Sequence, residues 1–157
     1  MLTESMEDYL EMIYRIFQEK GYVRPVDLAE ALNVQPSSVT RMVQRLDEQG
    51  MITYEKYRNI SLSERGLAIG NFLVWRDETL KQFLSLLMPP DTVAGQVEGI
   101  EHYVTPVTMC LFRDLIAFFR SNPSYIEALR KTRIDGTYPE GEKLGELRAW
   151  LFQHSTD

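Results

Sequence analysis

The hexapeptide VEGIEH, residues 97–102, gathers three side chains that can bind a metal ion or a proton. Glu98, Glu101 and His102 stand at positions i, i+3 and i+4, so on a helix they share one face within a single turn. Two carboxylates so close repel each other, and either solvent screening or a bound cation can relieve the repulsion. The spacing alone leaves both explanations open.

A second acidic pair, Asp8 and Glu11, also stands at i and i+3. Two carboxylates about 4 Å apart repel by roughly 4 kcal/mol at an effective dielectric near 20, so convergence of the two pairs is costly unless a cation joins them. Oxygen ligands with one imidazole suit Mn²⁺ or Fe²⁺, and the absence of a nearby thiolate argues against Zn²⁺. The alternative is that each pair lies on a solvated helix face.

The elements that must position these residues are mainly helical. Apolar residues at helical spacing predict a first helix over 3–19, a second after Pro25, and a third from Pro36 to a stop at Gly50. The stretch MITYEKYRNISLS has β-branched and aromatic residues around a polar tip, which predicts a β-hairpin. Three helices followed by a hairpin indicate a winged helix-turn-helix.

The third helix carries a polar face that can read DNA. Its buried stripe is predicted to be Val39, Met42, Val43 and Leu46. The opposite face offers hydroxyls, amides and guanidiniums, which can bond base edges or phosphates in a major groove. The DNA-binding candidates are Arg41 and Gln44 for bases, Ser37, Ser38 and Thr40 for bases or backbone, and Arg45, Lys56, Tyr57 and Arg58 for phosphates. Gln35 is a further candidate, because it begins the stretch that is expected to enter the groove deepest. The alternative is a solvated face, as in winged helices that bind proteins.

Charge is unevenly distributed along the 157 residues. The net charge is −6, yet residues 20–66 hold seven Lys or Arg against six Asp or Glu, so the predicted DNA-binding segment is spared the negative charge. No run reaches the ~18 apolar residues of a membrane span, and the N-terminus lacks the features of a secretion signal. We therefore expect a cytoplasmic protein without membrane contact. The single cysteine, Cys110, lies in an apolar run and is expected to be buried.

The second half of the chain is predicted to be helical throughout. A long helix runs from Ser63, its expected N-cap, to about Met88, and Pro89-Pro90 separate it from the helix holding VEGIEH. The apolar helix VTMCLFRDLIAFF after Pro106 is expected to bury surface against another subunit or inside a single core. The expected domains are a winged-helix DNA-binding domain (1–70), a helical metal-binding and dimerisation domain (71–135), and a C-terminal linker and helix (136–157).

Three segments carry a family resemblance: SMEDYLEMIYRI, VQPSSVTRMVQRLDEQGMITYEKYRNISLSERG and VEGIEH. With them, over about residues 3–120, the chain resembles the diphtheria toxin repressor family of metal-dependent transcriptional repressors, in particular its manganese-responsive members. The resemblance implies a homodimer that binds a palindromic operator in double-stranded DNA, with a two-ion Mn²⁺ site between the domains, and repression of manganese uptake genes. The ligand positions that it implies are Asp8, Glu11, Asp77, Glu98, Glu101 and His102.

One position departs from the family pattern, because Asp77 stands where the manganese-responsive members have a histidine. With five carboxylates and one imidazole, the site is expected to prefer Mn²⁺ more strongly, or else to have one ion position weakened or lost. Both one ion and two ions per subunit therefore remain open, and Fe²⁺ is a further candidate. The alternative is a metal-independent winged-helix regulator that has lost its sensor. An enzyme acting on an organic substrate is disfavoured, since the chain has no H-E-x-x-H, Glu-x-x-His or phosphate-binding loop.

Overall fold

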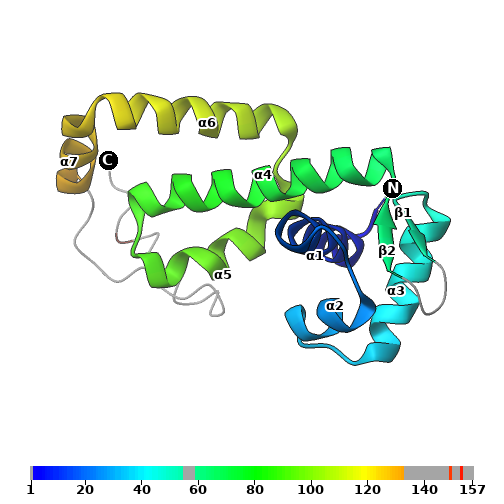
Figure 1. The fold of residues 1–157 in the computed structure, drawn as a ribbon. Coiled ribbons are helices and arrows are strands. Elements are labelled where there is room, and N and C mark those ends of the chain that lie inside the picture. The colour runs from blue at the N-terminus through cyan, green and yellow to red at the C-terminus, as the bar shows by residue number, and fades with distance from the viewer. Residues whose placement is uncertain (1, 55–58, 133–148, 150–152, 154–157) are drawn as a thin grey trace. The chain divides into compact units, whose positions relative to one another are not determined.

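The computed structural model describes residues 2–54, 59–132, 149 and 153 of the chain. It separates into two compact units, residues 1–121 and 122–157. The elements of the first unit are α1 (Glu4–Lys20), α2 (Pro25–Ala31), α3 (Pro36–Glu48), β1 (Ile52–Tyr54), β2 (Ile60–Leu62), α4 (Glu64–Leu87), α5 (Pro90–Ile100), the 3₁₀ helix η1 (Glu101–Tyr103) and α6 (Pro106–Ser121) (Figure 1). In the second unit the structure describes α7 (Pro123–Thr132).

The first helices and the hairpin share one apolar core. Leu10 and Ile13 of α1, Leu28 of α2, and Val43 and Leu46 of α3 are fully buried in it. α1 ends where Gly21 takes a left-handed φ of 77°, and its N–H donates to the carbonyl oxygen of Phe17. Burial of this apolar face, more than helix propensity, stabilises such short helices.

The hairpin is the wing. β1 and β2 pair antiparallel with Ile52 opposite Leu62 and Tyr54 opposite Ile60, and Val23 forms a bridge to Ile60. The fold class, a winged helix-turn-helix followed by helices, is thereby confirmed. The predicted wing-tip residues Lys56, Tyr57 and Arg58 lie outside the described residues, as does most of the predicted C-terminal helix.

The long helix α4 joins the wing to the second half of the unit. Ser63 caps it, as expected, by accepting a hydrogen bond from the Gly66 N–H at 2.9 Å. Two glycines of α4 allow neighbouring segments to approach the helix closely. A Cβ on Gly66 would lie 1.8 Å from the Met51 carbonyl oxygen, and one on Gly70 would lie 2.8 Å from Cβ of Tyr14. α4 can therefore pack tightly on the wing at one turn and on α1 at the next (Figure 1).

α4, α5 and α6 enclose a smaller apolar cluster formed by Leu80, Val93, Val97 and Met109. α6 buries Met109 and Ile116 but exposes Val107, Leu111 and Leu115 on another face. The expectation that Cys110 is buried is wrong, because its side chain is exposed. The apolar run misled the prediction, since this helix has more apolar surface than the subunit itself covers.

The VEGIEH segment is also not a continuous helix. α5 ends at Ile100, whose φ of −123° departs from helical values, and Glu101 and His102 lie on η1. A 3₁₀ turn has three residues per turn, so these two side chains are re-aimed relative to Glu98. Among the described residues, no helix is long and apolar enough to cross a membrane.

Candidate metal centre and nucleic-acid interface

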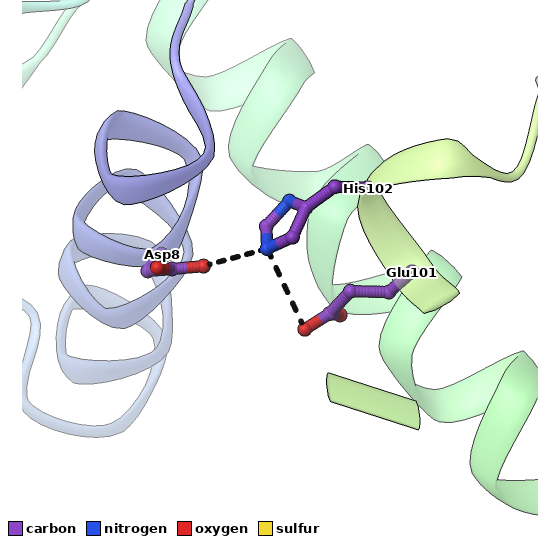
Figure 2. Close-up of side chains that lie close together, drawn as sticks. All are labelled: Asp8, Glu101 and His102. Atoms are coloured by element: carbon purple, nitrogen blue, oxygen red, sulfur yellow. Dashed lines mark ion pairs between the residues drawn. The ribbon is translucent and has the colours of Figure 1, made fainter. Parts of the chain in front are cut away.

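Asp8, Glu101 and His102 converge although more than ninety residues separate the first from the others. Each offers one ligand atom, and these atoms lie within 4.8 Å of one another (Figure 2). His102 Nε2 lies 3.1 Å from Oδ1 of Asp8 and 4.0 Å from Oε1 of Glu101. The three residues line a cleft of roughly 560 Å³ whose other walls come from α1, α4 and α5. Two carboxylates and one imidazole at this separation can bind a divalent cation.

His102 is held in place by its other ring nitrogen. Nδ1 lies 3.0 Å from Oε2 of Glu7, and Arg76 donates to the same Glu7 oxygen at 2.9 Å. Arg76 is buried on α4, and its Nη2 lies 3.3 Å from Nδ1 of His102. A carboxylate on the second ring nitrogen is a common way to orient a metal-binding histidine. Glu7 and Arg76 therefore aim Nε2 toward Asp8 and Glu101.

Glu101 has unused acceptor capacity. Within the described part of the chain, its buried Oε2 has no hydrogen-bond partner, and Arg76 Nη2 stands 3.9 Å away. Burial raises the pKa of this carboxyl, and repulsion from Glu11 and Asp77 raises it further against the opposing effect of Arg76. A buried carboxylate oxygen without a donor is costly, and a cation relieves that cost.

Asp8 is half-exposed at the edge of the same cleft. Burial raises the pKa of its carboxyl, His102 opposes the shift, and Glu7 and Glu98 add to it. The residues present thus fit a divalent cation held by Asp8, Glu101 and His102. Two carboxylates and an imidazole suit such an ion, and Oε2 of the Glu101 carboxylate is buried with no hydrogen-bond partner among the described residues.

The other three predicted ligands line the cleft but do not join this group of three. Glu98 is exposed at the end of α5. Asp77 is 5% exposed, and its Oδ2 accepts from Arg15 Nη2 at 2.5 Å and from Lys81 Nζ at 2.7 Å. Glu11 accepts from Arg15 Nε at 2.9 Å. Burial raises the pKa of the Glu11 carboxyl, the Arg15 hydrogen bond lowers it, and Asp77 raises it.

The polar face of α3 is free of the rest of the first unit. Every predicted DNA-binding residue that the structure describes is exposed: Gln35, Ser37, Ser38, Thr40, Arg41, Gln44 and Arg45. Val39, Val43 and Leu46 are buried on the opposite side, while Met42 is half-buried. The Thr40 hydroxyl donates to the carbonyl of Pro36 at 3.1 Å, which turns it toward its own backbone. The start of α3 therefore presents an exposed polar face.

Four charged residues of the site were not predicted from the sequence: Glu7, Arg15, Arg76 and Lys81. Arg15 follows Glu11 by four residues and Lys81 follows Asp77 by four, which is the spacing of intrahelical ion pairs. That signal was available. The pairs Arg15–Asp77 and Arg76–Glu7 both join α1 to α4. The two residues of each pair stand 62 and 69 positions apart in the chain, respectively, and no spacing rule predicts such pairs.

Each half of the chain matches a family model. Residues 1–60 match "Iron dependent repressor, N-terminal DNA binding domain", and residues 63–128 match "Iron dependent repressor, metal binding and dimerisation domain". A relative from Shouchella clausii, named "HTH-type transcriptional regulator MntR", is 45% identical over 90% of this chain and its own full length. A Geobacillus thermodenitrificans protein of the same name is 48% identical over 83% of this chain and 93% of its own.

A solved structure described as "Manganese-dependent transcriptional repressor complex with manganese" superposes with a TM-score of 0.59 at 25% identity. The match covers 71% of this chain and 52% of that one, so this chain spans about half of its length. A winged DNA-reading domain joined to a metal-binding, dimerising helical domain defines a metal-dependent transcriptional regulator. The chain belongs to the iron-dependent repressor family. This membership confirms the prediction that the chain is a transcriptional regulator and not an enzyme.

Proposed function

We propose that the chain is a cytoplasmic, Mn²⁺-activated repressor of manganese uptake genes that binds a palindromic operator as a homodimer. The convergence of Asp8 with Glu101 and His102 carries the proposal. Asp8 belongs to α1, which packs on the DNA-reading helices, while Glu101 and His102 belong to the half of the chain that matches a metal-binding and dimerisation domain. The proposed ion site therefore lies where the two halves meet.

The donors and the relatives together favour manganese. Two carboxylates and a single imidazole form a set that suits Mn²⁺ or Fe²⁺. Cys110, the only thiol of the chain, lies on the exposed face of α6 and cannot supply a soft ligand to this cleft. The relatives' name MntR and the manganese complex of the solved neighbour support the same ion.

The residues link the ion to DNA through α1. A bound cation supplies the positive charge that offsets repulsion among the site carboxylates. With Asp8 held beside Glu101 and His102, α1 and the reading helix α3 keep one orientation relative to the dimerisation half. The two reading heads then match the spacing of an operator without a further ordering cost. By linkage, operator DNA raises metal affinity by the same factor.

The exposed face of α6 supports the homodimer. Val107, Leu111 and Leu115 recur every four residues and are 73%, 58% and 41% exposed. A stripe of large apolar side chains on a soluble helix is typical of a surface that another subunit covers. The match to a dimerisation domain includes this helix. We therefore assign the α6 stripe to the subunit interface.

Titration of a selected operator tests the proposal. A duplex is selected from random DNA with the Mn²⁺-loaded protein, and its binding is followed by fluorescence anisotropy with and without Mn²⁺. We expect Mn²⁺ to raise affinity at least tenfold for the natural protein, and to leave Asp8→Asn unresponsive because a ligand is missing. Asp91→Asn removes an exposed carboxylate on α5, outside the cleft, and serves as the matched control.

Two results would contradict the proposal. If Mn²⁺ leaves operator affinity unchanged in the natural protein, the chain is a metal-independent winged-helix regulator. If Asp8→Asn responds as fully as Asp91→Asn, the ion acts elsewhere.

A further inference from the structure

The cleft contains two kinds of acidic group. Asp8 and Glu101 face one another and His102, with a buried Glu101 oxygen that has no donor within the described residues. Asp77 and Glu11, in contrast, already accept hydrogen bonds from cationic side chains. The cleft therefore has two halves. In one, the nearest protein cation, Arg76, stands 3.9 Å from Glu101, and in the other Arg15 and Lys81 hydrogen-bond the carboxylates directly.

The half that holds Asp77 and Glu11 is closed from two sides. Arg15, on α1, reaches Asp77 with Nη2 and Glu11 with Nε, so a single guanidinium spans both carboxylates. Lys81, one turn after Asp77 on α4, places Nζ on the same Asp77 oxygen and also lines the cleft. An ion approaching Asp77 would meet two positive charges beside Oδ2 of that carboxylate.

We propose that Arg15 and Lys81 take the place of a second metal ion, so that each subunit binds one divalent cation, at Asp8, Glu101 and His102. The inference rests on the proposed function and sets its stoichiometry. Asp77 is then a structural residue that accepts hydrogen bonds from Arg15 of α1 and from Lys81 of its own helix. The surplus acidity that Asp77 and Glu11 bring to the cleft is balanced by these two side chains.

Counting the ions tests this inference directly. Mn²⁺ is added to the full-length protein, equilibrium dialysis with elemental analysis gives the ions bound per subunit, and electron paramagnetic resonance reports whether bound ions couple magnetically. We expect one ion per subunit and the uncoupled six-line spectrum of an isolated Mn²⁺. In the double variant Arg15→Met, Lys81→Met we expect two ions per subunit and a broadened, spin-coupled spectrum. Arg65→Met, which removes an exposed cation elsewhere on α4, is the control and is expected to bind one ion.

Two ions per subunit with a coupled spectrum in the natural protein would overturn the inference while leaving the proposed function intact. A folded double variant, checked by circular dichroism, that still binds one ion would overturn it too. If the double variant does not fold, the count and spectrum of the natural protein decide alone. A natural protein that binds no Mn²⁺ would overturn both this inference and the proposed function.

Discussion

Replacing Gly66 with alanine is expected to separate the wing from the long helix behind it. A Cβ at this position would stand 1.8 Å from the carbonyl oxygen and 2.9 Å from the carbonyl carbon of Met51. The obstacle is backbone, so no side-chain rotation can relieve it. The same carbonyl oxygen accepts a hydrogen bond from the Ser63 N–H at 3.0 Å, and that bond must lengthen when the two segments move apart.

The magnitude follows from three contributions. Alanine is better than glycine inside a helix by about 1 kcal/mol, and the weakened hydrogen bond costs about 1 kcal/mol, so these two nearly cancel. Overpacking remains, at about 1–3 kcal/mol, and a clash with backbone places this variant near the upper end. The free energy of unfolding is therefore expected to fall by about 3 kcal/mol.

Equilibrium urea unfolding, followed by far-ultraviolet circular dichroism, measures the change. A loss of that size lowers the urea midpoint by about 1 M or more, since the dependence on urea is about 1–3 kcal/mol per molar for small proteins. Gly95→Ala is the matched control, because Gly95 lies in helix α5 with nothing within 4 Å of an added Cβ. It is expected to be neutral or slightly stabilising. A Gly66→Ala variant as stable as Gly95→Ala would refute the reasoning about the wing junction.

Three further predictions concern charge, DNA contact and assembly. Hydrogen bonds from Arg24 and Lys20 hold the pKa of the Asp27 carboxyl well below its usual range. The ionised carboxylate therefore stabilises the fold at pH values above the pKa of the unfolded chain, near 4. This contribution is lost as the pH falls below that value. Urea unfolding at several pH values is expected to show Asp27→Asn less stable than the natural protein at pH 7, with the difference shrinking below about pH 4; a gap independent of pH would contradict this. Arg41→Ala is expected to weaken binding to the selected operator by about 1–3 kcal/mol in fluorescence anisotropy and to relax sequence preference, whereas an unchanged affinity would remove α3 from the groove. Leu111→Asp is expected to convert the dimer to a monomer in sedimentation velocity, while Val26→Asp, at an exposed apolar residue on α2, leaves the dimer intact. A Leu111→Asp variant that stays dimeric would exclude the α6 face from the interface.

The helices and the wing could be predicted because local physics determines them. Apolar periodicity marked the buried faces of α1 and α3, Ser63 marked the start of α4, and two prolines marked its end. Cys110 was misassigned because an apolar run does not tell burial within a subunit from burial between subunits. The VEGIEH segment was misassigned as one helix because the change to a 3₁₀ turn at Glu101 has no strong signal in composition.

The composition of the candidate site was only partly predictable. Spacing singled out acidic pairs, and the family resemblance added Asp77, but neither distinguishes a carboxylate that waits for a cation from one that a guanidinium already holds. That distinction depends on which side chains of α1 face α4, and Arg15 meets Asp77 across 62 residues of chain. The predicted ligand set therefore stays a prediction, and ion counting decides which of its members bind.

α4 runs without interruption for 24 residues, from the base of the wing past Asp77 to Leu87. At about 1.5 Å per residue it is a rod some 36 Å long, supported on α1 where Gly70 meets Tyr14. Leverage follows from that length: tilting such a rod by about 5° carries one end roughly 3 Å relative to the other. A small adjustment among side chains near its middle can thus become a displacement comparable to the rise of one DNA base pair at the tip.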